Sequence, residues 1–274
     1  MAFLLSRRGV LMATAAVIPD PGDPGDPGET AVRYDFDQFP ADGYALLFDD
    51  TGFERSNTNT NWRRWLLTDR VIGDIMATSY RGSYYWEQQI LSSSGNVDGY
   101  HGPVAEPWWP EYSPPLSNPI NGGSLGWRGN GSIWGPSGSS QTSSVPTYTA
   151  GDRLMLCFNP FTGELWVGKN GVWNSDPDTD PPDATTPVDL LDGGVLFRIC
   201  GQARDGDDSQ RMFSTTDQFA YATPDSAIPL GAEDPPLVAE DLRITSQNTY
   251  QLLRNEVGKI SVTRVRAYML IQEE

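Results

Sequence analysis

The sequence predicts an all-β protein, and three observations lead to that prediction. The 274 residues include 28 glycines and 22 prolines, and 11% are aromatic, a composition typical of many short strands joined by sharp turns. Helical spacing of apolar residues is hard to find anywhere in the chain. Residues 148–174 also read as a hairpin with its own turns. We therefore expect short antiparallel strands throughout the main body.

The hairpin is the segment around which the rest of the chain is arranged. Leu154–Phe158 and Glu164–Gly168 are apolar, β-branched or aromatic runs, as strands require. Residues 159–163 between them start with Asn-Pro, which favours a type I turn, and end in a glycine that tolerates positive φ. Asn170-Gly171 then favours a type I′ turn. The segment therefore sets its own register.

Two further stretches, together with the hairpin, resemble the SPRY family. Residues 148–174 contain YTAGD, TGELW and KNGVW in the order of the family's central signature. Arg81–Ile90 (RGSYYWEQQI) resembles the family's earlier strand, and Ser124–Trp134 resembles its glycine-rich strand pair. The resemblance implies a concanavalin-like, two-sheet antiparallel β-sandwich. It also implies a binding module whose specificity lies in variable loops, without naming a ligand.

Residues 1–31 are expected to form an apolar arm on a spacer. The arm's candidate assembly anchors are Phe3, Leu4, Leu5, Val10 and Leu11. Ser6-Arg7-Arg8 also resembles a twin-arginine export signal, so a docking arm and a cleaved signal both stay open, and we favour the arm because Met1 is present. The apolar run is shorter than the roughly 18 residues of a membrane span. Pro19–Gly28 repeats Asp-Pro-Gly, which stops helix and sheet and holds the arm away from the body.

The SPRY-like body is expected to span residues 32–222. Its further candidate strands are Tyr44–Phe48, Val188–Cys200 and Gln210–Tyr221. Residues 91–126 contain a long loop rich in proline and aromatic residues, and such loops are often functional. Aromatic faces stack on sugars and anchor protein contacts, so the candidate contacts are the loop residues Tyr100, His101, Trp108, Trp109 and Tyr112. In the alternative, Trp108 and Trp109 fold back to cap the sandwich.

Residues 223–274 are expected to be a linker and a C-terminal strand module for assembly. Ile260–Ile271 (ISVTRVRAYMLI) has the pattern of a strong strand, and with Glu273 it resembles a terminal segment of bacteriophage structural proteins. A long apolar strand invites pairing with other chains unless it is already paired. Tyr268 and Leu270 are therefore candidate assembly residues.

Charge and residue counts argue against several classes of function. The chain has 36 acidic and 19 basic residues, a net charge of −17, which repels phosphate backbones and argues against nucleic acid as a partner. His101 is the single histidine, and no serine has a nucleophile-elbow pattern around it. A polysaccharide-cleaving enzyme would need a carboxylate pair that the sequence does not place. We therefore expect no enzymatic activity and no cofactor.

The acidic loop and the two cysteines are weaker candidates for a site. Asp176, Asp178 and Asp180 alternate within DPDTDPPD and could offer oxygen ligands to calcium, but they lack the EF-hand pattern, so we expect no metal. Cys157 and Cys200 lie in apolar runs and are expected to be buried. A disulfide between them stays open, provided that their strands are adjacent.

The sequence as a whole predicts a non-enzymatic bacteriophage virion protein: a fibre, spike, baseplate or head-decoration subunit. Its expected partners are other virion proteins and copies of itself, with a trimer suggested by the habit of fibre proteins alone. Host-surface carbohydrate is a further expected partner. The alternative is an exported bacterial lectin or adhesin, secreted or at the cell surface, in which residues 1–18 are a signal.

Overall fold

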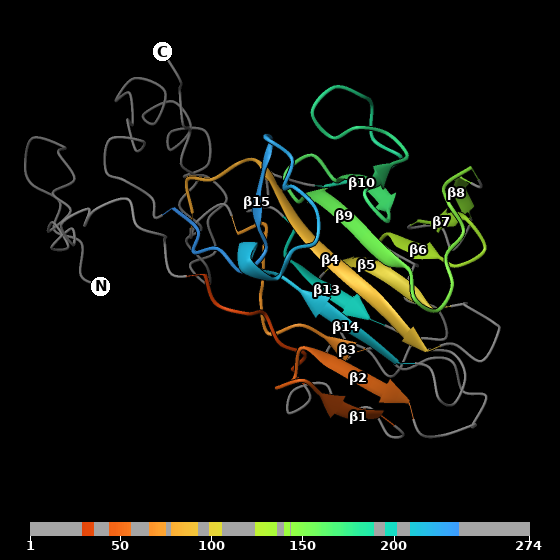
Figure 1. Ribbon diagram of the computed structural model, residues 1–274. Helices are drawn as coiled ribbons and strands as arrows, with labels where there is room; N and C mark the ends of the chain where they lie inside the picture. The colour runs from red at the N-terminus through yellow and green to blue at the C-terminus, as the bar shows by residue number, and fades with distance from the viewer. Residues whose placement is uncertain are drawn as a thin grey trace, which may run out of the picture.

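Two sheets packed face to face form the described part of the protein, and their strands are antiparallel except for the pairing of β15 with β4 (Figure 1). The computed structural model describes residues 29–35, 44–55, 66–74, 78–92, 99–105, 124–135, 140–142, 144–188, 195–201 and 209–235. Within these residues the single helical segment is the 3₁₀ turn η1, Thr216–Gln218, and no helix is long and apolar enough to cross a membrane. The prediction of an all-β two-sheet sandwich is therefore confirmed.

The larger sheet has nine strands. Seven follow the order β1-β2-β14-β4-β9-β10-β11, while β12 pairs with β10 and β15 pairs with β4. The bounds are β1 Tyr44–Leu47, β2 Gly52–Arg55, β14 Ser209–Phe213, β4 Ser83–Ser92, β9 Arg153–Asn159, β10 Glu164–Lys169, β11 Val172–Trp173, β12 Ala184–Thr185 and β15 Ala227–Pro229.

The smaller sheet has six strands in the order β3-β13-β5-β6-β7-β8. Their bounds are β3 Leu66–Leu67, β13 Phe197–Gly201, β5 Tyr100–Ala105, β6 Gly126–Arg128, β7 Ser132–Trp134 and β8 Ser140–Thr142. Figure 1 looks onto the outer face of the larger sheet, with β5 and β13 behind it.

The core fills the space between the two sheets. Alternate residues of a strand face opposite sides, and on β4 Tyr84 and Trp86 face inward. The same alternation on β9 and β13 adds Leu156, Phe158 and Phe197 to one continuous buried cluster. The residues between them on these strands face outward, so the same alternation determines which side chains lie on the outer faces of the sheets.

The hairpin expected from the turn signals is present as β9 and β10. Trp166 pairs with Cys157 in its register. Gly163 has φ of 75°, and Asn170 and Gly171 have φ of 52° and 84°, the left-handed values that the two turns require. The strands expected from Arg81–Ile90 and Ser124–Trp134 are also present, as β4 and the β6–β7 pair.

Strand β5 corrects the prediction that a loop begins directly after β4. Its sequence, YHGPVA, contains Gly102 and Pro103, which together resemble a turn. Gly102 has φ of +152°, and a Cβ there would lie 2.3 Å from the carbonyl oxygen of Leu125. Glycine is therefore needed for the close approach of the neighbouring chain, and β5 pairs with both β13 and β6.

Residues 222–235 correct the predicted end of the folded body. Strand β15 pairs in parallel with β4 at Ser83–Tyr85, and Leu230 is fully buried in the core. Its amide donates a 2.8 Å hydrogen bond to the carbonyl of Tyr85. The proline-rich composition resembles a linker, yet this segment continues the large sheet beyond the end of β14.

The two ends of the described chain lie side by side. The amide of Thr30 donates to the carbonyl of Gly231 at 2.9 Å, and a Cβ on Gly231 would lie 2.4 Å from the Thr30 carbonyl oxygen. Two residues after Thr30, the amide of Val32 donates a 2.8 Å hydrogen bond to the Ser214 hydroxyl. The chain therefore enters and leaves the sandwich along one edge.

Candidate binding surface

Outward-facing residues of the large sheet form an alternating row of aromatic rings and guanidinium groups. Arg211 has its guanidinium carbon 4.8 Å from the centre of the Phe48 ring and 5.0 Å from that of Phe213. Arg153 stands over the other ring, 3.5 Å from the centre of Phe213. Cations over aromatic faces attract the π electrons, so each arginine is held in place by the rings beside it. We call Phe48, Arg211, Phe213 and Arg153 the arginine–aromatic row.

Strand register explains how residues far apart in sequence meet in this row. Arg211 of β14 pairs with Gln89 of β4, and Gln89 pairs on its other side with Arg153 of β9. All three side chains therefore lie on one line across the outer face. Phe48 comes from the turn after β1, where it has φ of 56°, and its side chain is 45% exposed.

Glu87 anchors the inner end of the row. Its buried carboxylate forms an ion pair with the Nε of Arg153. It also accepts a 2.7 Å hydrogen bond from the Tyr85 hydroxyl and bonds of 3.1 and 3.0 Å from the amides of Ala220 and Tyr221. Burial, and secondly the neighbouring carboxylate, raises the pKa of Tyr85. Four donors therefore share the two carboxylate oxygens of Glu87, and the acceptor sites of this group are occupied by partners within the protein.

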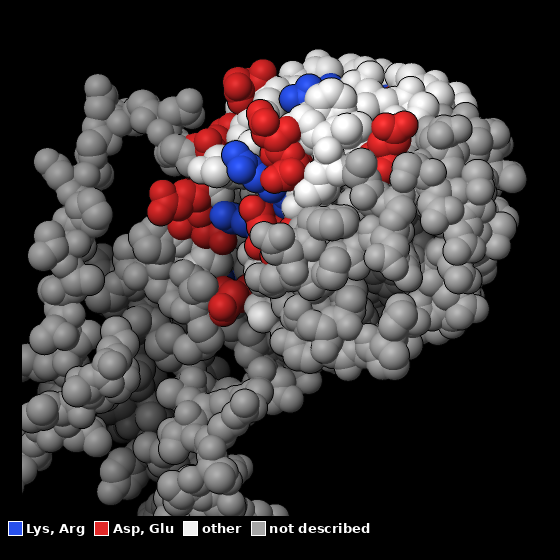
Figure 2. Space-filling model, turned by 90° about the horizontal axis from the view of Figure 1, so that it is seen from below, with Lys and Arg blue, Asp and Glu red and all other residues white. Residues whose placement is uncertain are grey.

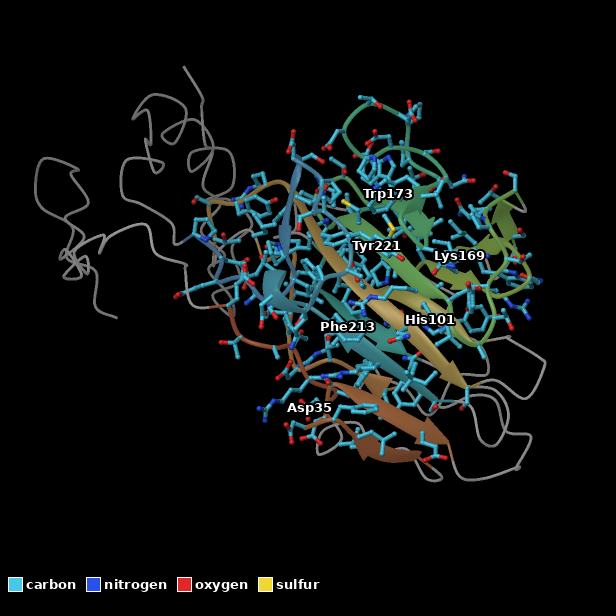
Figure 3. All side chains as sticks on the ribbon, viewed as in Figure 1. Asp35, His101, Lys169, Trp173, Phe213 and Tyr221 are labelled. Atoms are coloured by element: carbon cyan, nitrogen blue, oxygen red, sulfur yellow. The ribbon has the colours of Figure 1, made fainter. Side chains whose placement is uncertain are left out.

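The two amides on Glu87 belong to a segment that crosses the outer face, residues 214–226, which we call the strap. Its Phe219 and Tyr221 pack against a buried cluster of Tyr85, Met155, Cys157 and Trp166. Figure 3 shows Tyr221 close to Trp173, which contacts the same cluster. The strap therefore closes one half of the outer face and leaves the half beside Phe48 uncovered by it.

Aspartates of the acidic loop cap backbone amides. The Asp178 carboxylate accepts hydrogen bonds from the amides of Asp225 and Ser226 at 3.0 and 2.8 Å and so holds the far end of the strap. Asp176 and Asp180 accept from amides within their own turn. Among the described residues no group of three or more acidic, histidine or cysteine side chains is placed to hold a metal ion.

The cysteines lie in different sheets. Cys157 belongs to β9 of the large sheet and Cys200 to β13 of the small sheet, and both are free and buried. Burial raises the pKa of each thiol to about 12. The strand adjacency that a disulfide would have needed is therefore absent.

Two of the five predicted contact residues are buried in strand β5 and do not lie in an exposed loop. Tyr100 and His101 belong to β5 and are buried. His101 packs edge-on against Tyr148 with 5.3 Å between ring centres, and burial lowers its pKa to about 3. The expected exposure of these two rings is wrong because β5 continues through the Gly-Pro pair.

The other predicted contacts and anchors lie outside the described residues. They are Trp108, Trp109 and Tyr112 of the loop, Phe3, Leu4, Leu5, Val10 and Leu11 of the arm, and Tyr268 and Leu270 of the C-terminal module. Their roles stay predictions. The arginine–aromatic row, by contrast, was not predicted, because it brings together residues of two strands, β14 and β9, and a turn, and no local pattern marks such a set.

Comparisons with known proteins find similarity in fold. No protein-family model matches the sequence, and a search of curated proteins finds no match. The structure is similar to the SPRY domain of human HERC1, with 15% identity and a TM-score of 0.45 over 65% of this chain and 98% of that one.

A TRIM65 PSpry domain is similar at 12% identity and a TM-score of 0.45, covering 68% of this chain and 90% of that chain. A human SPRY domain gives 15% identity and a TM-score of 0.40, with 62% and 96% covered. At this level the similarity concerns the fold alone. The chain is a two-sheet β-sandwich similar to SPRY domains.

Proposed function

We propose that this chain is a non-enzymatic binding subunit of a larger assembly, held through its two chain ends and free to bind through the outer face of its large sheet. The more specific form of the proposal is a bacteriophage virion protein: a fibre, spike, baseplate or head-decoration subunit. Its partners are copies of itself and other virion proteins, and host-surface carbohydrate is its external ligand.

The observation that carries the proposal is the hydrogen bond between Thr30 and Gly231. The described residues therefore begin and end at the edge where Thr30 and Gly231 meet. Glu29 strengthens that edge, since its carboxylate accepts a 2.7 Å hydrogen bond from the Thr216 hydroxyl. Attachment through both extensions would therefore occupy one edge and leave the arginine–aromatic row accessible.

The virion assignment is supported by the sequence of the two extensions. The C-terminal strand pattern Ile260–Ile271 resembles that of bacteriophage structural proteins, and residues 1–18 have the composition of an apolar arm. Charge supports an external role as well, because a net charge of −17 keeps assembled surfaces soluble and away from nucleic acid. Figure 2 shows acidic side chains on the visible described surface, with basic ones between them.

The test compares the full chain with three shortened proteins: residues 29–274, 1–235 and 29–235. Sedimentation velocity measures the oligomeric state of each, and antibody labelling of gradient-purified particles from the source culture locates the chain. We expect the full chain to form oligomers, residues 29–235 to be a folded monomer, and the particles to be labelled.

Two results would contradict the proposal. Identical sedimentation of all four proteins as monomers would remove the assembly role of the extensions. Unlabelled particles, together with the full antigen in the cell envelope or medium, would favour the exported lectin in place of the virion protein.

A further inference from the structure

We propose that Arg211 and Phe48 form a subsite for a sugar that carries a carboxylate group. This inference rests on the proposed function, since it names the ligand class of the face that the assembly leaves open. It goes beyond that function by assigning the contact to two residues that lie outside the predicted loop.

The two arginines of the row differ in how their hydrogen-bonding capacity is used. Arg153 pairs with Glu87 and donates from its second nitrogen to the carbonyl of Gln218 at 2.7 Å. Arg211 has no carboxylate or carbonyl partner within the described part of the chain, and its Nε is buried without an acceptor. A guanidinium carries five hydrogen-bond donors in a rigid fork. Arg153 uses donors on two of its nitrogens within the protein, whereas Arg211 keeps its donors for a ligand.

The rings around Arg211 hold it in an orientation suited to a ligand. Phe213 lies beneath it and is nearly buried, while Phe48 lies beside it and exposes 45% of its surface. A ring packed against an arginine restricts the side chain before binding, which lowers the entropy that binding would cost. The exposed ring leaves an apolar face next to a bidentate cation.

Neighbouring side chains complete a surface of mixed character. Gln89, the partner of Arg211 in the strand register, is half-buried and offers an amide that both donates and accepts. Leu91, two residues further along β4, is 36% exposed. Glu54 is exposed on β2, opposite Ser209, and forms no ion pair with Arg211 in the described structure.

A carboxylated sugar fits these groups in three ways. Its carboxylate takes the guanidinium fork, where bidentate pairs are strongest. Its C–H face packs on the exposed Phe48 ring, and its hydroxyls match the amide of Gln89. The overall negative charge of the protein favours a ligand with a single carboxylate over a polyanion, because repulsion grows with each added charge.

The test titrates the full chain with two probes that carry one carboxylate each, sialyllactose and galacturonic acid, at an ionic strength of about 0.15 M, where distant charges are screened. The controls are lactose and the methyl esters of both probes, which keep the shape and lose the charge. We expect at least one acid to bind and its ester to bind at least tenfold more weakly. Failure of both acids to bind would overturn the inference.

Matched variants locate the subsite. Arg211→Gln is expected to lower the affinity at least tenfold, and Arg211→Lys several-fold, because an ammonium keeps the charge without the fork. Phe48→Ala should weaken binding and Glu54→Gln should strengthen it. Arg33→Gln removes the same charge from an exposed side chain elsewhere and should leave the affinity unchanged.

The result of the sugar-binding test can be distinguished from the result of the assembly test. Circular dichroism shows whether each variant is folded, and Arg211→Lys preserves the cation over Phe213 if Arg211→Gln does not fold. Equal affinity of the Arg211→Lys and wild-type proteins, or equal binding of acid and ester, would overturn the inference even if the chain assembles as proposed. Tight binding of the acid by a monomeric chain would instead support the subsite and contradict the assembly.

Discussion

Glu87 and Arg153 form a buried ion pair on the outer face of the large sheet, from adjacent strands of that sheet. The same carboxylate holds the strap through the amides of Ala220 and Tyr221. This pair therefore separates the closed half of the face from the half that carries Arg211. Glu87 contacts the strap directly, and Arg153 contacts Phe213 of the arginine–aromatic row.

Replacing Glu87 should loosen the strap and destabilise the fold. Glu87→Gln leaves Arg153 largely buried without its counter-ion, and such losses cost about 3 to 5 kcal/mol. Urea unfolding measures the change, and hydrogen exchange should show faster exchange of the Ala220 and Tyr221 amides. Glu54→Gln, at an exposed position, is the control and should change stability by less than about 0.5 kcal/mol. Equal effects of the two substitutions would show that the ion pair does not hold the strap.

Because of His101, the free energy of unfolding should decrease as the pH is lowered. Burial lowers its folded-state pKa to about 3 from an unfolded value near 6.5. Above pH 6.5 the imidazole is neutral in both states and contributes no pH dependence. As the pH falls below 6.5, the unfolded chain binds a proton that the folded chain does not, so stability is lost until the pH reaches about 3.

The measurement compares wild-type and His101→Gln proteins by urea unfolding at pH 7 and pH 4.5. The wild-type protein should lose about 2 to 3 kcal/mol more than the variant over this interval, since one proton contributes about 1.4 kcal/mol per pH unit. The carboxylates titrate in both proteins and cancel in the difference. Parallel pH profiles would mean that His101 is accessible to protonation in the folded state.

Gly201 is expected to tolerate no side chain. A Cβ at this position would lie 1.9 Å from Nε2 of Gln210 and 2.6 Å from the Tyr34 hydroxyl. These two groups form a buried 2.9 Å hydrogen bond, so Gly201→Ala should force them apart and cost about 1 to 3 kcal/mol.

Thermal unfolding checks this cost against Gly151→Ala. Gly151, unlike Gly201, has positive φ, but a Cβ there would meet nothing within 4 Å, so only backbone strain of about 1 kcal/mol applies. The double variant Gly201→Ala, Gln210→Ala should recover part of the loss. A cost no larger than that of Gly151→Ala would indicate that the hydrogen-bonded pair moves freely.

The folded domain should require residues 223–235. A protein of residues 29–222 lacks β15 and the fully buried Leu230, whereas residues 29–235 retain both. We expect sharp near-ultraviolet circular dichroism and a cooperative thermal transition only for the longer protein. Equally cooperative unfolding of both would restore the earlier boundary near residue 222.

Local patterns predicted the parts of the fold that are determined locally. The β9–β10 hairpin follows from Asn-Pro, Gly163 and Asn170-Gly171, because each turn residue sets its own backbone angles. Strand β5 was missed because Gly102 and Pro103 have the pattern of a turn, and only the close approach of Leu125 explains the glycine. Strand β15 was missed because its proline-rich sequence suits an edge as well as a linker.

The candidate surface could not have been found from sequence spacing. Arg211 and Arg153 are brought onto one line by two strand pairings through Gln89. Phe48 reaches Arg211 from a turn whose positive φ is uncommon for an aromatic residue. The acidic loop was a local pattern, yet its aspartates cap amides of the strap and of their own turn, a use that depends on where the strap lies.

Hydrogen exchange of the assembled full chain, compared with residues 29–235 and read peptide by peptide, tests the central claim most directly. The account predicts that assembly protects the edge formed by residues 29–35 and 227–235, while the peptides that contain Phe48 and Arg211 exchange equally in both proteins until an acidic sugar is added. Protection of the Phe48 and Arg211 peptides on assembly alone, with none at the shared edge, would show that the outer face is an assembly interface and contradict the account.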